Sequence, residues 1–207
     1  MLLQQIHTKY DTDKGKVHSY IEVYDGLFAP FTNAHINFLE IGALTCGSLK
    51  MFHDYFEKAS IYGMDNWSQN YDWRNQTLNV QNLREEIAND WPRINLISAD
   101  STNTLMMHDK LAGLKFDIII DDGNHEPWAQ LASFQNLLPF WNWDAGLYVI
   151  EDIVHIESLK DSISQCVQDR NLPLKCQIYQ FDNNPTSDDK LLVVRKISRT
   201  FTRYGYW

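Results

Sequence analysis

The chain has 207 residues, 44% of them hydrophobic and 22% charged, which is typical of a soluble globular protein with one sizeable core. Its net charge of −9 argues against non-specific binding to nucleic acids or anionic membranes, since both need a basic surface. No apolar run reaches the roughly 18 residues that a membrane helix needs, and the start is too polar for a signal peptide. Three cysteines without metal-ligand spacing predict reduced thiols and a cytoplasmic location.

Short apolar segments alternate with longer segments of helical periodicity along most of the chain. Strands are expected at residues 36–42, 60–65, 94–98, 115–121 and 146–152, and helices at 47–59, near 80–90, at 103–112, from about 126 to 138 and through about 168. This alternation predicts a parallel sheet with helices on both faces. Residues 174–181 and 190–197 flank a turn-rich stretch, which predicts a C-terminal antiparallel hairpin. The expected fold is one doubly wound α/β domain over residues 1–207.

Carboxylates follow every one of the five expected parallel strands. In such sheets the ligand binds outside the carboxyl ends of the strands. The loop after the first strand, EIGALTCGS, contains neither GxGxxG nor GK[ST], and an acidic rim would repel phosphates. A positively charged ligand with a ribose and no phosphate fits this rim, as S-adenosylmethionine (SAM) does. The alternative is that each carboxylate only caps a helix or solvates a strand end. These residues are Glu40, Asp65, Asp100, Asp121, Asp122, Glu151 and Asp152.

Several sequence pieces occur together in a recognisable order. They are TDKG with His18 and Tyr24, LEIG followed by GSLKMF, IYGMD, FDIIIDDGNH and LYVIEDI, and they cover most of residues 8–153. In these pieces the chain resembles the class I SAM-dependent methyltransferases, and more narrowly the metal-dependent O-methyltransferases of macrolide deoxysugars. The resemblance implies a Rossmann-like core over residues 36–207, preceded by a segment, 1–35, that covers the cofactor.

The resemblance also assigns the cofactor contacts. Gly42 would let the backbone approach the methionine part of SAM, Asp65 would take the ribose hydroxyls, and Asp100 would lie near the adenine. Lys14 is expected to meet the SAM carboxylate, and Asp121 to orient neighbouring groups or contact SAM. The full expected set is Thr12, Lys14, His18, Tyr24, Glu40, Gly42, Asp65, Asp100, Ser101 and Asp121.

A metal site is expected where the fourth and fifth strands end side by side. Asp122 would lie there beside Glu151 and Asp152, and three such carboxylates repel unless they are protonated or bridged by a cation. Oxygen ligands select Mg²⁺, with Mn²⁺ or Ca²⁺ as substitutes, and the resemblance assigns these three residues as the ligands. Mg²⁺ would acidify a sugar hydroxyl, and His125 would take its proton as general base. Taken alone, His125 reads equally as a surface or capping histidine.

The acceptor implied by the resemblance is a sugar, such as the 6-deoxyhexose rhamnose in a glycan or glycoside. Trp67, Tyr71 and Trp73 lie in the polar loop 66–79 and suit a sugar ring, unless the loop packs its own aromatic residues. Two alternatives stay open: a catechol or other small diol as acceptor, and a SAM-binding or metal-binding domain without turnover. The aromatic, basic tail 199–207 suggests a homodimer contact, a neighbouring domain of a longer polypeptide, or a frayed end.

Overall fold

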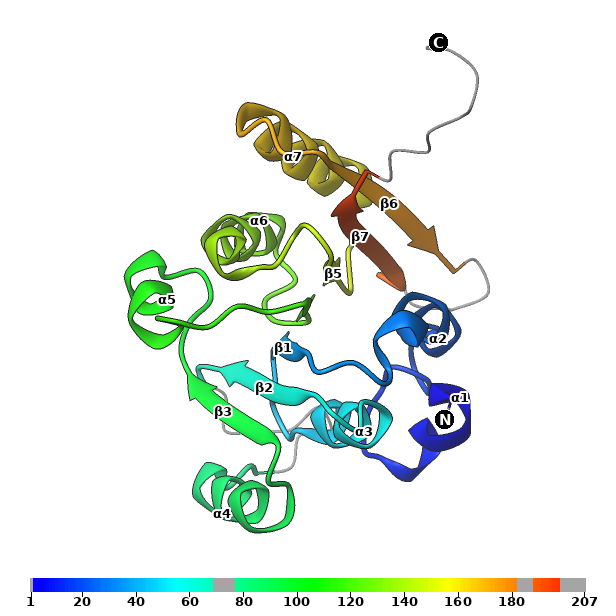
Figure 1. The fold of residues 1–207 in the computed structure, drawn as a ribbon, viewed down its shortest axis with the longest axis vertical. Helices are drawn as coiled ribbons and strands as arrows, with labels where there is room; N and C mark the ends of the chain where they lie inside the picture. Colours follow the sequence, from blue (N-terminus) through cyan, green and yellow to red (C-terminus); the bar gives the residue numbers. More distant parts are fainter. Residues whose placement is uncertain (1, 69–76, 182–187, 198–207) are drawn as a thin grey trace.

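A computed structural model describes residues 2–68, 77–181 and 188–197, and its strands form one seven-stranded sheet in the order β3-β2-β1-β4-β5-β7-β6 (Figure 1). Strands β1 to β5 pair in parallel, whereas β7 runs antiparallel to both β5 and β6. The predicted parallel sheet with a C-terminal antiparallel hairpin is therefore confirmed. The strands are β1 (Asn37–Ile41), β2 (Ser60–Asp65), β3 (Ile94–Ser98), β4 (Ile118–Asp121), β5 (Leu147–Ile150), β6 (Leu174–Gln180) and β7 (Lys190–Lys196).

Helices cover both faces of the sheet, as the sequence predicts (Figure 1). Successive residues of a strand point to opposite faces. Ile118 and Ile120 of β4 accordingly join a core with residues of α1 to α4, while Ile119 joins a second core with residues of α5 to α7. The helices are α1 (Leu3–Ile6), α2 (Ile21–Phe28), α3 (Gly47–Tyr55), α4 (Val80–Asp90), α5 (Thr104–Lys110), α6 (Pro127–Leu137) and α7 (Ile156–Asp169), with short 3₁₀ turns η1 (His7–Lys9), η2 (Ala29–Phe31) and η3 (Leu138–Phe140).

Local sequence explains where several helices begin. The side chain of Asn79 accepts a hydrogen bond from the backbone N–H of Asn82 at the start of α4, and Asn103 caps α5 in the same way. α6 begins at Pro127, a residue that suits the first helical position because its missing N–H would have no partner there. Among the helices of the described ranges, none is long and apolar enough to cross a membrane.

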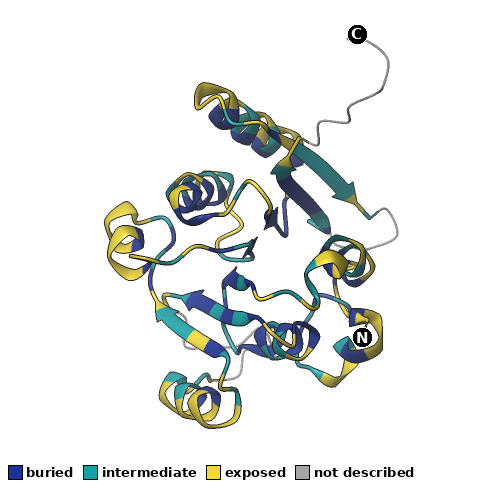
Figure 2. Cartoon of the chain, viewed as in Figure 1, coloured by how far each residue is buried: buried dark blue, intermediate teal, exposed yellow. Residues whose placement is uncertain are grey.

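The N-terminal segment packs along the carboxyl end of the sheet. Tyr24 and Phe28 of α2 are fully buried and stack on each other with ring centroids 4.8 Å apart, and both pack edge-on against Phe52 of α3. At Gly47, the first residue of α3, a Cβ would lie 1.7 Å from the backbone oxygen of Asp11. The inner strands β1, β4 and β5 are almost wholly buried, whereas the outer strands β3 and β6 and the outer helix faces are partly or fully exposed (Figure 2). The segment therefore belongs to the packed structure around the strand ends.

Candidate active site

All five parallel strands bring polar residues at their carboxyl ends to one edge of the sheet. Ile41 of β1 pairs with Asp121 of β4, and Asp121 pairs with Ile150 of β5, so the residues that follow these strands meet. A cavity of about 740 Å³ opens at this edge. Of the predicted site residues, it is lined by Gly42, Asp65, Asp100, Ser101, Asp122, His125 and Asp152. These seven residues, which the sequence places at strand ends, therefore surround one cavity.

Gly42 makes the closest backbone approach at this edge. Its φ is +85°, in the left-handed region that favours glycine, and a Cβ would lie 1.9 Å from the backbone oxygen of Asp122. Any side chain would push the loop after β1 away from Asp122. The glycine therefore keeps the two walls of the cavity in contact.

Asp65 and Asp100 line the cavity and also organise the loops around it. The two carboxylate oxygens of Asp65 accept hydrogen bonds from the backbone N–H groups of Leu44, at 2.9 Å, and Trp67, at 2.6 Å. Asp100 Oδ1 accepts from the backbone N–H and the hydroxyl of Thr102. Both residues thus bind loop backbone, where the sequence had offered helix capping or strand-end solvation as the alternative, and both also line the cavity.

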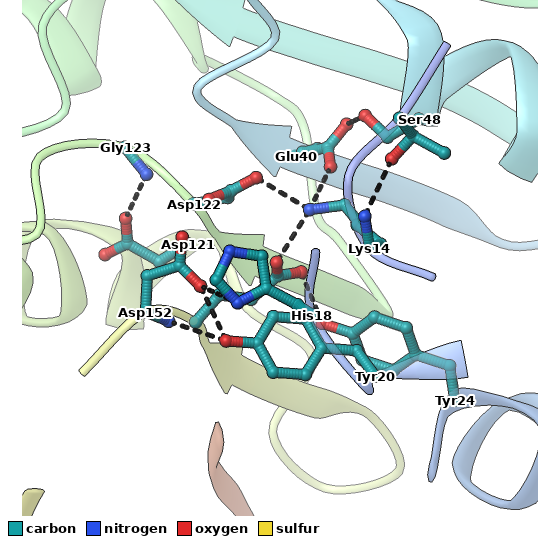
Figure 3. A network of polar contacts seen from close by, with 12 residues as sticks. Lys14, His18, Tyr20, Tyr24, Glu40, Ser48, Asp121, Asp122, Gly123 and Asp152 are labelled. Atoms are coloured by element: carbon teal, nitrogen blue, oxygen red, sulfur yellow. Dashed lines mark hydrogen bonds and ion pairs between the residues drawn. The ribbon is translucent and has the colours of Figure 1, made fainter. Parts of the chain in front are cut away.

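Lys14 lies at the centre of a buried acidic network (Figure 3). Its Nζ is 2.6 Å from Asp122 Oδ2, 2.7 Å from Glu151 Oε2 and 3.2 Å from Glu40 Oε1. Burial by itself would lower the pKa of this ammonium, but the three carboxylates outweigh it and hold the pKa well above its ordinary value. Lys14 does not line the cavity, and its contact with the SAM carboxylate stays a prediction.

Glu40 and Glu151 are engaged on both oxygens. Glu40 Oε2 accepts a hydrogen bond from the Ser48 hydroxyl at 2.5 Å, and Glu151 Oε1 accepts one from the Tyr24 hydroxyl. Burial raises the pKa of both carboxyls, and the Lys14 ammonium opposes that rise. Neither side chain lines the cavity. Tyr24 likewise contacts Glu151 from the protein interior.

Asp152 is held by aromatic residues of the N-terminal segment. The Tyr20 hydroxyl donates to Asp152 Oδ1 at 2.6 Å, and the Tyr20 ring stacks on His18 with centroids 5.0 Å apart. His18 Nδ1 lies 3.5 Å from Asp152 Oδ1 and 3.4 Å from Asp189 Oδ1, at the start of the last strand. The sequence analysis missed Tyr20 and Asp189. Tyr20 had a signal, because it lies four residues before Tyr24 and therefore on the same side of a helix.

His125 faces the two carboxylates that open into the cavity. Its Nε2 is 3.5 Å from Asp122 Oδ1 and 3.8 Å from Asp152 Oδ2, and its side chain is 41% exposed. The contact with Asp122 raises the pKa of His125 above its ordinary value, although burial works in the other direction. Three ligand atoms, one each from Asp122, His125 and Asp152, lie within 4.8 Å of one another.

The donor set at this edge suits a hard divalent ion, since carboxylate oxygens supply most of it. A second group with the same spacing consists of Glu40, Asp122 and Glu151, and its centre is where the Lys14 ammonium lies. Asp122 belongs to both groups, whereas Asp152 belongs only to the first and Glu151 only to the second. The predicted ligand set of Asp122, Glu151 and Asp152 does not form a single group in this arrangement, and it stays a prediction.

Two further predicted contacts, Asp121 and Thr12, are buried behind the cavity wall, whereas Ser101 lines the cavity. Asp121 is buried with no hydrogen-bond partner at Oδ2, and burial raises its pKa to about 7. Thr12 is buried beside Lys14 and accepts a long hydrogen bond, 3.4 Å, from the Lys14 backbone N–H. The Ser101 hydroxyl shares a 2.7 Å hydrogen bond with that of Ser133.

The aromatic loop is only partly described, since Tyr71 and Trp73 lie outside the described residues. Trp67 is 9% exposed, donates from Nε1 to the backbone oxygen of Leu44 at 3.1 Å, and stacks under the guanidinium of Arg84. The packing alternative therefore holds for Trp67. An aromatic face does border the cavity, but it belongs to Trp128, which is 62% exposed.

Strand order and the acidic cavity at the carboxyl ends define the class I SAM-dependent methyltransferase fold, and solved structures agree. The MycE methyltransferase of the mycinamycin biosynthetic pathway, in complex with Mg and SAH, matches 99% of this chain and 57% of its own with a TM-score of 0.69 and 23% identity. Its complex with Mg, SAH and mycinamycin VI matches 94% and 48%, with a TM-score of 0.60 and 25% identity. Human methyltransferase-like protein 13 with SAH matches 84% and 78%, with a TM-score of 0.53 and 15% identity.

Curated relatives point to a narrower group, the O-methyltransferases. The mycinamicin VI 2''-O-methyltransferase of Micromonospora griseorubida is 31% identical over 73% of this chain. The 8-demethyl-8-alpha-L-rhamnosyl tetracenomycin-C 2'-O-methyltransferase of Streptomyces olivaceus is 29% identical over 70% of it. No protein-family model matches the chain. The chain is therefore a homologue of these O-methyltransferases, and its matched part spans about a third of their length, 36% in both.

Proposed function

We propose that this chain is a SAM- and Mg²⁺-dependent O-methyltransferase whose acceptor is a sugar hydroxyl, on a 6-deoxyhexose such as rhamnose in a glycoside or glycan. The observation that carries the proposal is the convergence of Asp122, His125 and Asp152 in the same cavity as Asp65 and Asp100. Relatives that are named as O-methyltransferases of rhamnosyl tetracenomycin and of mycinamicin VI support the sugar acceptor.

SAM would occupy the half of the cavity between the loops after β1, β2 and β3. Asp65 offers carboxylate oxygens to the two ribose hydroxyls, and charge-assisted hydrogen bonds of this kind are the stronger ones. Asp100 and Ser101 border the place expected for the adenine, and Gly42 leaves room for the methionine part. The acidic wall also favours the positive sulfonium over a phosphate-bearing ligand.

The acceptor would lie in the other half, beside His125. Asp122 and Asp152 are the residues whose oxygens would hold a divalent ion on this side. A bound Mg²⁺ would supply Lewis acidity that lowers the pKa of an acceptor hydroxyl and fixes its orientation. His125 would then take the hydroxyl proton as the new oxygen–carbon bond forms and the sulfur–carbon bond of SAM breaks. The exposed ring of Trp128 supplies an apolar face for a sugar ring.

The charge and the cysteines of the chain bear on its partners and its location. The net charge of −9 supports neither nucleic acid nor a membrane surface as partner, and three unpaired cysteines support a cytoplasmic location. We also infer a homodimer contact or a neighbouring domain as partner, because residues 199–207 are rich in aromatic and basic side chains. The core over residues 36–207 would carry the chemistry, with residues 1–35 completing the site.

The test is methyl transfer from labelled SAM in the presence of Mg²⁺ to three acceptors: a methyl rhamnoside, a rhamnosylated polyketide and a catechol. We expect the label on the methyl rhamnoside or on the rhamnosylated polyketide. EDTA should abolish turnover, and Mg²⁺ or Mn²⁺ should restore it. His125→Ala should lower kcat by about 10²–10⁴-fold while SAM affinity is kept. Labelling of the catechol alone would reject the sugar acceptor, and full activity in excess chelator would reject the metal.

A further inference from the structure

The ammonium of Lys14 occupies a position that has the geometry of a metal site. Oxygens of Glu40, Asp122 and Glu151, following or ending three different strands, approach one another within 4.8 Å and surround Nζ at 2.6 to 3.2 Å. Lys14 is 1% exposed, and Glu40 and Glu151 are equally buried. Uncompensated carboxylates at this depth would each cost several kcal/mol to desolvate. Protonation or a cation must therefore offset these charges, and the chain supplies a cation from its own N-terminal segment.

We propose that Lys14 is a tethered counter-cation that divides the acidic strand ends into two compartments. The inner compartment contains Glu40, Glu151 and Asp122 Oδ2 and is closed by the ammonium. The outer compartment contains Asp122 Oδ1, His125 and Asp152 and opens into the cavity. Lys14 acts as a positioning residue, since by holding one oxygen of Asp122 it turns the other toward His125. The role of the outer compartment as a divalent-ion site rests on the proposed function.

The contacts around the ammonium support this division. Glu151 Oε1 accepts from the Tyr24 hydroxyl, and Glu40 Oε2 accepts from the Ser48 hydroxyl, so both glutamates are turned toward the interior. Figure 3 shows the Lys14 ammonium in contact with Glu40 and Asp122, whereas Asp152 is in contact with Tyr20. The inner compartment thus receives one ammonium and two hydroxyl donors from within the protein, and an exchangeable ion is left to the outer one.

Removing the ammonium should convert the inner compartment into a second ion site. Lys14→Met keeps most of the side-chain length and removes the charge, whereas Lys14→Arg keeps the charge. We expect Lys14→Met to melt lower than the parent protein without divalent ions and to bind one more equivalent of Mn²⁺ by calorimetry. At about one hundred times the dissociation constant, that extra site should raise the melting temperature by roughly 5–10 °C more than in the parent. Lys14→Arg should gain no site, even if its larger group lowers stability.

Equal Mn²⁺ stoichiometry and an equal Mn²⁺-dependent rise in Lys14→Met and the parent would overturn the proposal. If Lys14→Met does not fold even with Mn²⁺, the variant Lys14→Met with Glu151→Gln decides, because it removes one negative charge together with the positive one. Recovery of folding supports a charge role for Lys14, and failure to recover overturns it. A parent protein that binds no Mn²⁺, beside a Lys14→Met variant that does, would refute the metal in the proposed function and leave this inference standing.

Discussion

Gly42→Ala tests whether the contact between the loop after β1 and the backbone of Asp122 holds the site together. At a φ of +85°, an alanine would have a left-handed backbone, which costs about 1–2 kcal/mol. Its Cβ would also meet the Asp122 oxygen at 1.9 Å, and relieving such an overlap costs about 1–3 kcal/mol more. The sum, about 2–5 kcal/mol, corresponds to a fall in melting temperature of about 4–20 °C for a domain of this size. SAM affinity should fall with it, because the displaced loop carries one wall of the cavity.

Gly113→Ala is the matched control for this experiment. Gly113 has a φ of +80°, but no other atom lies within 4 Å of the position that an alanine Cβ would take, so only the backbone cost of about 1–2 kcal/mol applies. Thermal unfolding and calorimetric titration with SAM should be measured for both variants. The reasoning is refuted if the two variants lose the same stability and both keep the parent affinity for SAM.

Three further outcomes are expected. Gly26→Ala, on an exposed turn of α2 with nothing within 4 Å of the added methyl, should stabilise the protein by about 0.5–1 kcal/mol, and a lower melting temperature would contradict this. In ion-free protein, NMR should find the pKa of His125 above 6.5, because the contact with Asp122 favours the protonated ring. The contribution of this contact to stability is then present below the pKa of His125 in the unfolded state and is lost as the pH rises through its pKa in the folded state. A pKa that is not raised would contradict the contact. Asp65→Asn should weaken SAM binding about tenfold in calorimetry, whereas Asp109→Asn on the surface should not; equal affinities would remove Asp65 from the site.

The sequence was sufficient for the fold because its strands are marked locally. Ile118, Ile119 and Ile120 form an uninterrupted apolar run, as expected of a parallel strand buried on both faces, and all three are fully buried. The predicted strand nevertheless began three residues before β4, because Phe116 makes only an isolated bridge with Trp141. A strand ends where the neighbouring strand no longer offers backbone hydrogen-bond partners. The local sequence pattern does not show where that happens.

The sequence predicts that polar residues at the strand ends gather around one cavity. It does not predict in which direction each of their side chains points. The contacts of Lys14 with Asp122 and Glu151 span 108 and 137 residues, and no periodicity near Lys14 signals them. Glu151 and Asp152 directly follow β5, where strand alternation no longer sets the direction of a side chain. Asp152 also has a φ of +53°, which turns the chain out of the strand.

The distance in sequence between Lys14 and its carboxylates also sets an order of events during protein synthesis. At translation rates of roughly 5–20 residues per second, Glu151 leaves the ribosome about 7–27 s after Lys14, given their separation of 137 residues. Glu40 is the first of the three carboxylates to emerge, and β5 must join the sheet before the last is in place. The segment that carries Lys14 is made before its three carboxylates, and it reaches its final contacts only after the last of them is in place.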